Sequence, residues 1–137
     1  GVALSHSRIR LGARADRVEW FEADVTSFQP PHRFDLWHDR AVFHFLTLAD
    51  ERQRYLDQVQ RAVRPGGHVI MATFAEDGPT RCSGLDVARY SPAALHEVLG
   101  SGFALESSTR EDHLTPAGNS QAFVYCLFRR ESGSPAR

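Results

Sequence analysis

The apolar positions of the chain follow a helical period in one stretch and become nearly continuous in the next. From about Asp50 they repeat at helical spacing, which predicts a helix with one buried face. Pro65 and two glycines end that helix in a tight turn. The apolar stretch His68–Phe74 then has the pattern of an interior strand covered on both faces. The residues on the apolar face of the helix are Tyr55, Leu56, Val59, Ala62 and Val63.

Similar patterns on either side predict six further elements. Ser91 and Pro92 open one of them as the N-cap and first residue of a helix. The alternation of helices and strands predicts an α/β fold with a mostly parallel sheet, closed by an antiparallel hairpin of the last two strands. The six elements are helices at Ala3–Arg14 and Ser91–Gly100, and strands at Arg17–Asp24, Phe34–Asp39, Phe103–His113 and Gln121–Arg130.

Composition limits the class of protein without naming a function. With 137 residues and 42% apolar residues, the chain is long enough for one domain, predicted at 1–130 with a flexible polar tail at 131–137. The net charge of -1 argues against a nucleic-acid surface. No apolar run is long enough for a membrane span. Cys82 and Cys126 fit no metal or redox spacing, so a reducing cytoplasm is the expected compartment.

Four segments occur in an order that characterises one enzyme family. They are Glu22–Val25 (EADV), Phe34–Leu46 (FDLWHDRAVFHFL), Val63–Val69 (VRPGGHV) and the closing hairpin. Together they cover residues 17–130 and resemble the third to seventh strands of a class I methyltransferase that uses S-adenosylmethionine (SAM). The resemblance implies a Rossmann-like methyltransferase sheet, SAM as cofactor and a small-molecule methyl acceptor. It also implies that His68–Phe74 lies between Phe34–Asp39 and an antiparallel Gln121–Arg130.

The family's glycine-rich loop and the acidic residue that ends its second strand have no counterpart in the sequence. The only Gly-x-Gly, Gly100–Gly102, lies too late in the chain to be a cofactor loop. We therefore expect an N-terminally truncated methyltransferase domain with little activity alone. In that case Arg17–Asp24 pairs with Phe34–Asp39, pairs with another chain, or comes loose. The alternative is a non-catalytic remnant that acts through a partner or by self-association at its open sheet edge.

The cofactor-binding candidates follow from the resemblance. It implies that Asp24 accepts a hydrogen bond from the adenine amino group and that the backbone of Val25 meets the adenine ring. It also places Asp39 and Arg40 beside the cofactor. The alternatives are a solvated turn aspartate at Asp24, and at Asp39 a helix N-terminal carboxylate paired with Arg40.

Two histidines are candidates for a catalytic base, because histidine titrates near neutral pH. They are His38 and His44, and for both an interior or loop-anchoring role is the alternative. Their spacing of six residues suits no helical metal-ligand pair, so no metal is expected. Residues 75–90 form a long loop that would cover the acceptor, where Arg81, Arg89 and Tyr90 could orient a polar or anionic molecule. Cys82 could touch the substrate or be an ordinary loop cysteine.

Overall fold

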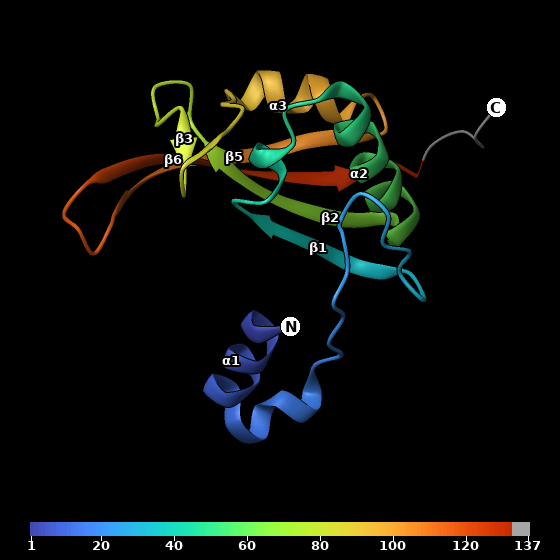
Figure 1. Cartoon of the computed structure of the whole chain (residues 1–137). Helices are drawn as coiled ribbons and strands as arrows, with labels where there is room; N and C mark the ends of the chain where they lie inside the picture. The colour runs from blue at the N-terminus through green and yellow to red at the C-terminus, as the bar shows by residue number, and fades with distance from the viewer. Residues whose placement is uncertain (133–137) are drawn as a thin grey trace.

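A four-stranded mixed sheet lies at the centre of the molecule (Figure 1), and the computed structural model describes residues 1–132. The first pairing of the sheet is parallel and the other two are antiparallel. The α/β class, the interior position of His68–Phe74 and the antiparallel C-terminal hairpin are therefore confirmed. In spatial order the strands are β1 (Phe34–Arg40), β2 (Val63–Phe74), β6 (Ser120–Arg130) and β5 (Phe103–Leu114).

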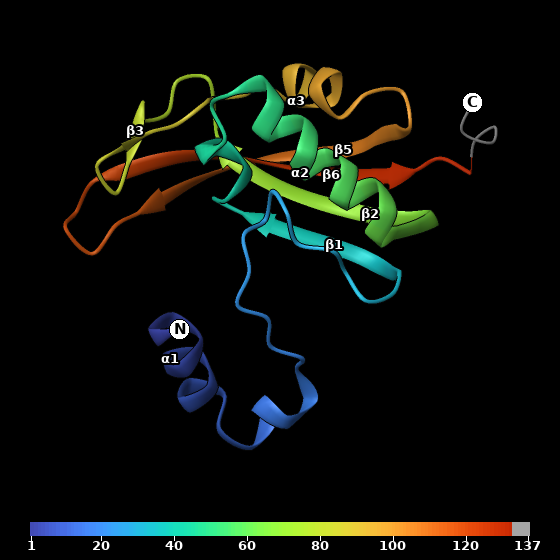
Figure 2. The ribbon, with the colours of Figure 1, turned by 45° about the vertical axis from the view of Figure 1, so that its right-hand side comes forward.

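Two helices cover one face of the sheet. Figures 1 and 2 show α2 (Ala49–Ala62) and α3 (Pro92–Leu99) side by side on that face. The short helix η2 (Phe43–Phe45) connects β1 to α2. Helix α1 (Val2–Leu11) continues as η1 (Gly12–Arg17), lies apart from the sheet beyond the β1 edge and buries none of its residues. No helix within residues 1–132 has the length and apolar character that a membrane span needs.

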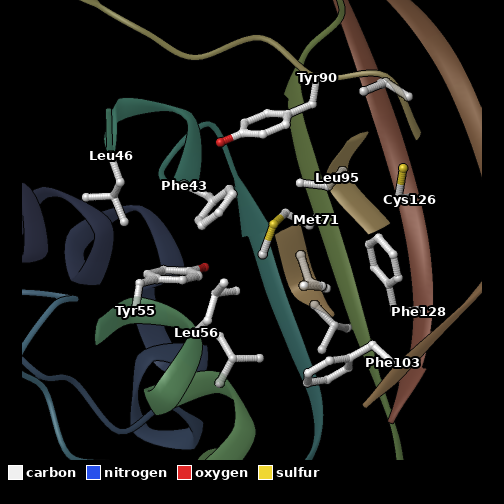
Figure 3. Packing of buried hydrophobic residues seen from close by; sticks show 14 of the residues in the cluster. Phe43, Leu46, Tyr55, Leu56, Met71, Tyr90, Leu95, Phe103, Cys126 and Phe128 are labelled. Carbon is white, nitrogen blue, oxygen red and sulfur yellow. The ribbon is translucent and has the colours of Figure 1, made fainter. Parts of the chain in front are cut away.

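The main core lies between the sheet and the two helices (Figure 3). Buried side chains from β2 and β6 meet the apolar face of α2 that the sequence predicts. A smaller cluster lies on the opposite face, where Ala72, Phe74 and Phe123 are covered by a short hairpin rather than a helix. That hairpin consists of β3 (Arg81–Cys82) and β4 (Leu85–Asp86). β2 is thus buried on both faces from Met71 to Phe74, as the continuous apolar sequence predicts, while His68 and Ile70 stay partly exposed.

The predicted strand at Arg17–Asp24 is wrong. The segment has no strand geometry, and Val18 and Phe21 remain 42% and 45% exposed. Its apolar residues suit a strand, but a strand is stable only when a neighbouring strand forms the hydrogen bonds of the ladder with it. Within residues 1–132 no strand does so, because β1 pairs with β2 alone and forms the open edge of the sheet. Of the three outcomes expected for this segment, the structure rules out direct pairing with β1.

The predicted turn before the interior strand is a bulge within β2. Phe34 pairs with Val63, and Leu36 then pairs with His68, so β2 carries extra residues between two ladder positions. Gly66 has a φ of 81°, which favours glycine. A side chain at Gly67 would approach the Asp35 carbonyl oxygen to 2.9 Å. The two glycines are therefore needed to bring β2 against β1 at this point.

The N-terminus of α3 offers a test of local structure. The Ser91 hydroxyl accepts a hydrogen bond of 3.0 Å from the Ala94 backbone N–H, as the predicted N-cap requires. Replacing Ser91 by alanine should lower the free energy of unfolding by about 1 kcal/mol. Urea denaturation measures the change, with Ser101→Ala in an exposed turn as the control. Equal effects of the two substitutions would show that the cap does not stabilise the helix.

Candidate functional site

A surface cavity of about 320 Å³ lies at the carboxyl end of β1. Ligands of open α/β sheets bind outside this edge. The cavity brings together four residues that the sequence singles out as candidates, namely Val25, His38, Asp39 and Arg40. Trp37, Val42 and Tyr55 complete its lining.

Asp39 is the most heavily hydrogen-bonded residue of this cavity. Only 5% of it is exposed, although it sits at the end of an edge strand. Its carboxylate accepts hydrogen bonds from the backbone N–H groups of Val42, at 3.0 Å, and Phe43, at 3.1 Å. It also accepts a short hydrogen bond from the Tyr55 hydroxyl. Burial raises the pKa of the Asp39 carboxyl, although these three hydrogen bonds act in the opposite direction.

Tyr55 and Trp37 are parts of this network that sequence reasoning missed. The sequence places Tyr55 on the buried face of its helix, which is correct for its ring, and Trp37 packs against the same core while partly buried. The polar atoms have a further role, because the Trp37 Nε1–H donates to the Tyr55 oxygen at 3.0 Å and Tyr55 donates to Asp39. Burial, and then the Asp39 charge, raise the pKa of Tyr55, so its proton stays on the hydroxyl. The sequence offered one sign of this network, because the hydroxyl of a buried tyrosine usually needs a hydrogen-bond partner.

The geometry indicates that Asp39 positions the loop after β1. Its carboxylate fixes the two amides that begin η2, which is the helix N-terminal interaction weighed from the sequence. Arg40 is not its ion-pair partner. The Arg40 Nε–H donates to the Tyr125 hydroxyl at 2.6 Å, and the guanidinium lies 4.4 Å from the centre of the Phe123 ring. Among residues 1–132, no carboxylate forms an ion pair with Arg40.

Asp24 lies in an exposed turn next to Val25. Its carboxylate oxygen accepts hydrogen bonds from the Thr26 hydroxyl, at 2.7 Å, and the Thr26 backbone N–H, at 2.8 Å. These bonds lower the pKa of Asp24, with a smaller contribution from the charge of Arg54. The geometry is that of a solvated turn aspartate. It leaves the second carboxylate oxygen without a hydrogen bond from any residue of the described part of the chain.

The two candidate histidines have different environments. His38 is exposed and lines the cavity. His44 is fully buried and anchors its loop, because its Nδ1 accepts a 3.2 Å hydrogen bond from the Phe74 backbone N–H. Burial lowers the pKa of His44 to about 4, which keeps the ring neutral. Its Nε2 has no hydrogen-bond partner among residues 1–132.

The four acceptor-site candidates fall on different sides of the sheet. Tyr90 is buried among the residues of the main core, with its ring 5.7 Å from that of Phe43 (Figure 3). Cys82 packs instead against the small cluster on the opposite face. Arg81 forms an ion pair with Asp86, and Arg89 donates to the Gly78 carbonyl oxygen at 3.1 Å. The four side chains therefore do not line one pocket in this structure.

The family of the chain follows from its sequence. A family model for thiopurine S-methyltransferase matches residues 4–131, and the chain belongs to this family of methyltransferases. No curated protein sequence matches the chain. Across the described residues, no group of three or more histidine, cysteine, aspartate or glutamate side chains is placed to hold a metal ion.

Several solved structures share the fold at low sequence identity. One is 1,6-didemethyltoxoflavin-N1-methyltransferase from Burkholderia thailandensis, with bound S-adenosylhomocysteine (SAH) and 1,6-didemethyltoxoflavin. It has a TM-score of 0.71 and 21% identity, over 94% of this chain and 56% of that chain. Another is the N-methyltransferase NodS from Bradyrhizobium japonicum, also with SAH, at a TM-score of 0.66 and 15% identity over 93% and 61% of the two chains.

A third similar structure is a SAM-dependent methyltransferase from Methanosarcina mazei. It has a TM-score of 0.61 and 13% identity, over 80% of this chain and 65% of that chain. The present chain thus spans between about half and two thirds of the length of these three proteins. Together they confirm the Rossmann-like methyltransferase fold.

Proposed function

We propose that the chain is part of a methyltransferase that transfers a methyl group from SAM to a small-molecule acceptor. The observation that carries the proposal is the cavity at the carboxyl end of β1, where Val25, His38, Asp39 and Arg40 meet. Its volume of about 320 Å³ is in the range of small-molecule sites. Membership of a methyltransferase family supports this function over that of a non-catalytic remnant.

Residues in and next to the cavity fit the adenine part of the cofactor. Asp24 carries a carboxylate whose pKa is lowered, so it is charged at neutral pH and can accept a hydrogen bond from the adenine amino group. Val25 offers an apolar neighbour in the cavity lining. Asp39 is already bonded to Val42, Phe43 and Tyr55, and therefore contributes by holding the loop in place.

When bound, SAM supplies a methyl group already activated by a sulfonium charge, so the protein needs mainly to align the acceptor and exclude water. A proton must leave an acceptor hydroxyl or amine as the new bond to the methyl carbon forms. His38 is the exposed candidate to accept it, since His44 is buried and neutral. We propose that the acceptor lies under residues 75–90, where Arg89 supplies positive charge close to the carboxyl end of β2, while the charge of Arg81 is paired with Asp86. We also propose a cytoplasmic location, consistent with two free cysteines.

Replacing Asp24 by alanine tests the adenine assignment. The change removes about one charge-assisted hydrogen bond, so affinity for SAH should fall roughly 10- to 100-fold. Titration calorimetry measures it, with the exposed Asp16→Ala as the matched control. Unchanged affinity in Asp24→Ala would reject the role of Asp24. Absence of SAH binding to the unmodified chain, together with dimerisation in sedimentation, would instead favour the remnant that self-associates through the open edge of β1.

A further inference from the structure

A second group of cavities lies at the other end of the strands from the candidate cofactor cavity, where β1 and β2 begin and the antiparallel β6 ends. The larger has a volume of about 390 Å³ and is lined by Arg33, Asp57, Gln60, Arg61 and Arg130. The smaller, of about 220 Å³, shares Arg33 and Arg61 with it and adds Gln58 and His32 among its lining residues. None of these residues lines the candidate cofactor cavity.

Three arginines converge here from separate elements. Arg33 precedes β1, Arg61 lies in the last turn of α2, and Arg130 ends β6. Two of the guanidinium groups are held by backbone oxygens, since Arg130 donates to the Val63 carbonyl oxygen and Arg61 donates to the Asp57 carbonyl oxygen at 3.3 Å. Each guanidinium has five N–H donors, so most donors of both remain available to a ligand.

The positive charges of these three arginines are not balanced by carboxylates. Five other arginines, at positions 54, 64, 81, 110 and 129, lie within 4.0 Å of an acidic side chain. Within residues 1–132, no such pair includes Arg33, Arg61 or Arg130. Asp57 is the one acidic residue in the lining of the larger cavity, and its carboxylate accepts a 3.0 Å hydrogen bond from Gln53. The three arginines therefore outnumber the carboxylates around this cavity.

The proximity of like charges is also reflected in the titration of Arg130. Burial lowers the pKa of its guanidinium, and the positive charge of Arg33 lowers it further. Bringing two such groups together costs free energy in the absence of an anion, and a bound anion with more than one charge would offset that cost.

We propose that Arg33, Arg61 and Arg130 form a binding site for the diphosphate or polyphosphate group of a small molecule. Planar guanidinium groups bind phosphate oxygens in pairs, and the exposed Gln60 amide in the lining of the larger cavity can donate to a remaining oxygen. The net charge of the whole chain is -1, so the positive charge is local to this end of the strands and matches a small ligand rather than a nucleic acid. This site is separate from the one proposed for SAM.

Binding of pyrophosphate to the chain tests the proposal. Titration calorimetry at low ionic strength should show saturable binding that weakens as salt is added. Arg33→Gln should reduce the affinity about tenfold or more, because it removes a charge-assisted contact. Arg54→Gln is the matched control, since Arg54 is exposed on α2 and paired with Asp50. Circular dichroism of each variant checks that it is folded.

Three results would overturn the proposal. One is the absence of saturable pyrophosphate binding by the folded chain. Another is an equal loss of affinity in Arg33→Gln and Arg54→Gln, which would indicate a diffuse charge effect. The third is competition between pyrophosphate and SAH for one site, because the proposed sites lie at opposite ends of β1.

Discussion

Replacing Asp39 by alanine is expected to lower the free energy of unfolding by about 3–5 kcal/mol. The substitution leaves three donors without their acceptor, namely the backbone N–H groups of Val42 and Phe43 and the hydroxyl of Tyr55. Phe43 and Tyr55 are fully or almost fully buried, so water cannot easily replace the carboxylate. Denaturant unfolding measures the loss.

Asp35→Ala is the matched control for this prediction. Asp35 lies in the same strand, but its side chain is 85% exposed and pairs with Arg64 at the surface. An exposed ion pair of this kind contributes about 0–1 kcal/mol. If the Asp39 and Asp35 substitutions cost the same, the buried network does not hold the loop after β1 in place.

The buried histidine leads to a pH dependence of similar size. In the unfolded chain His44 has a pKa close to 6.5, and burial lowers the pKa to about 4 in the folded chain. Between these values the unfolded state binds the proton more readily, so stability falls as the pH is lowered from 6.5 towards 4. The total contribution of His44 is up to about 3 kcal/mol.

The measurement is the difference in unfolding free energy between the unmodified chain and His44→Gln across this pH range. A difference is needed because burial raises the pKa of Asp39, whose titration therefore acts in the opposite direction. In His44→Gln, the unfolding free energy should lose the part of its pH dependence that His44 contributes. The control His6→Gln, in the exposed helix α1, should keep that pH dependence. An unchanged pH dependence of the unfolding free energy in His44→Gln would show that the titration of His44 does not affect stability.

Much of the fold could be predicted from the sequence because it depends on local patterns. The continuous apolar sequence of β2 identified an interior strand, and Ser91 identified the start of α3. The prediction of a strand at Arg17–Asp24 was wrong for a physical reason. Residues that favour a strand form one only when a neighbouring strand completes the hydrogen-bond ladder. No property of the segment itself indicates whether that neighbour is present.

The candidate site could be predicted only in part. The resemblance placed Val25, Asp39 and Arg40 beside the cofactor, and the structure brings these three residues and the base candidate His38 to one cavity. The network that fixes Asp39 depends on Tyr55, 16 positions away along the chain. The sequence assigned Tyr55 to the helix face correctly but could not show that its hydroxyl points at a carboxylate. The arginine cluster was missed because its members are distant in sequence and meet only through the order of the strands.

An NMR titration of the isotope-labelled chain with SAH tests the central proposal most directly. If the carboxyl end of β1 is the cofactor site, the amide signals of Val25 and of residues 39–42 should shift saturably. The signals of Arg33, Arg61 and Arg130 should remain unchanged. Saturable shifts confined to those three arginines, or no shift at the carboxyl end of β1 at saturating SAH, would contradict the proposal.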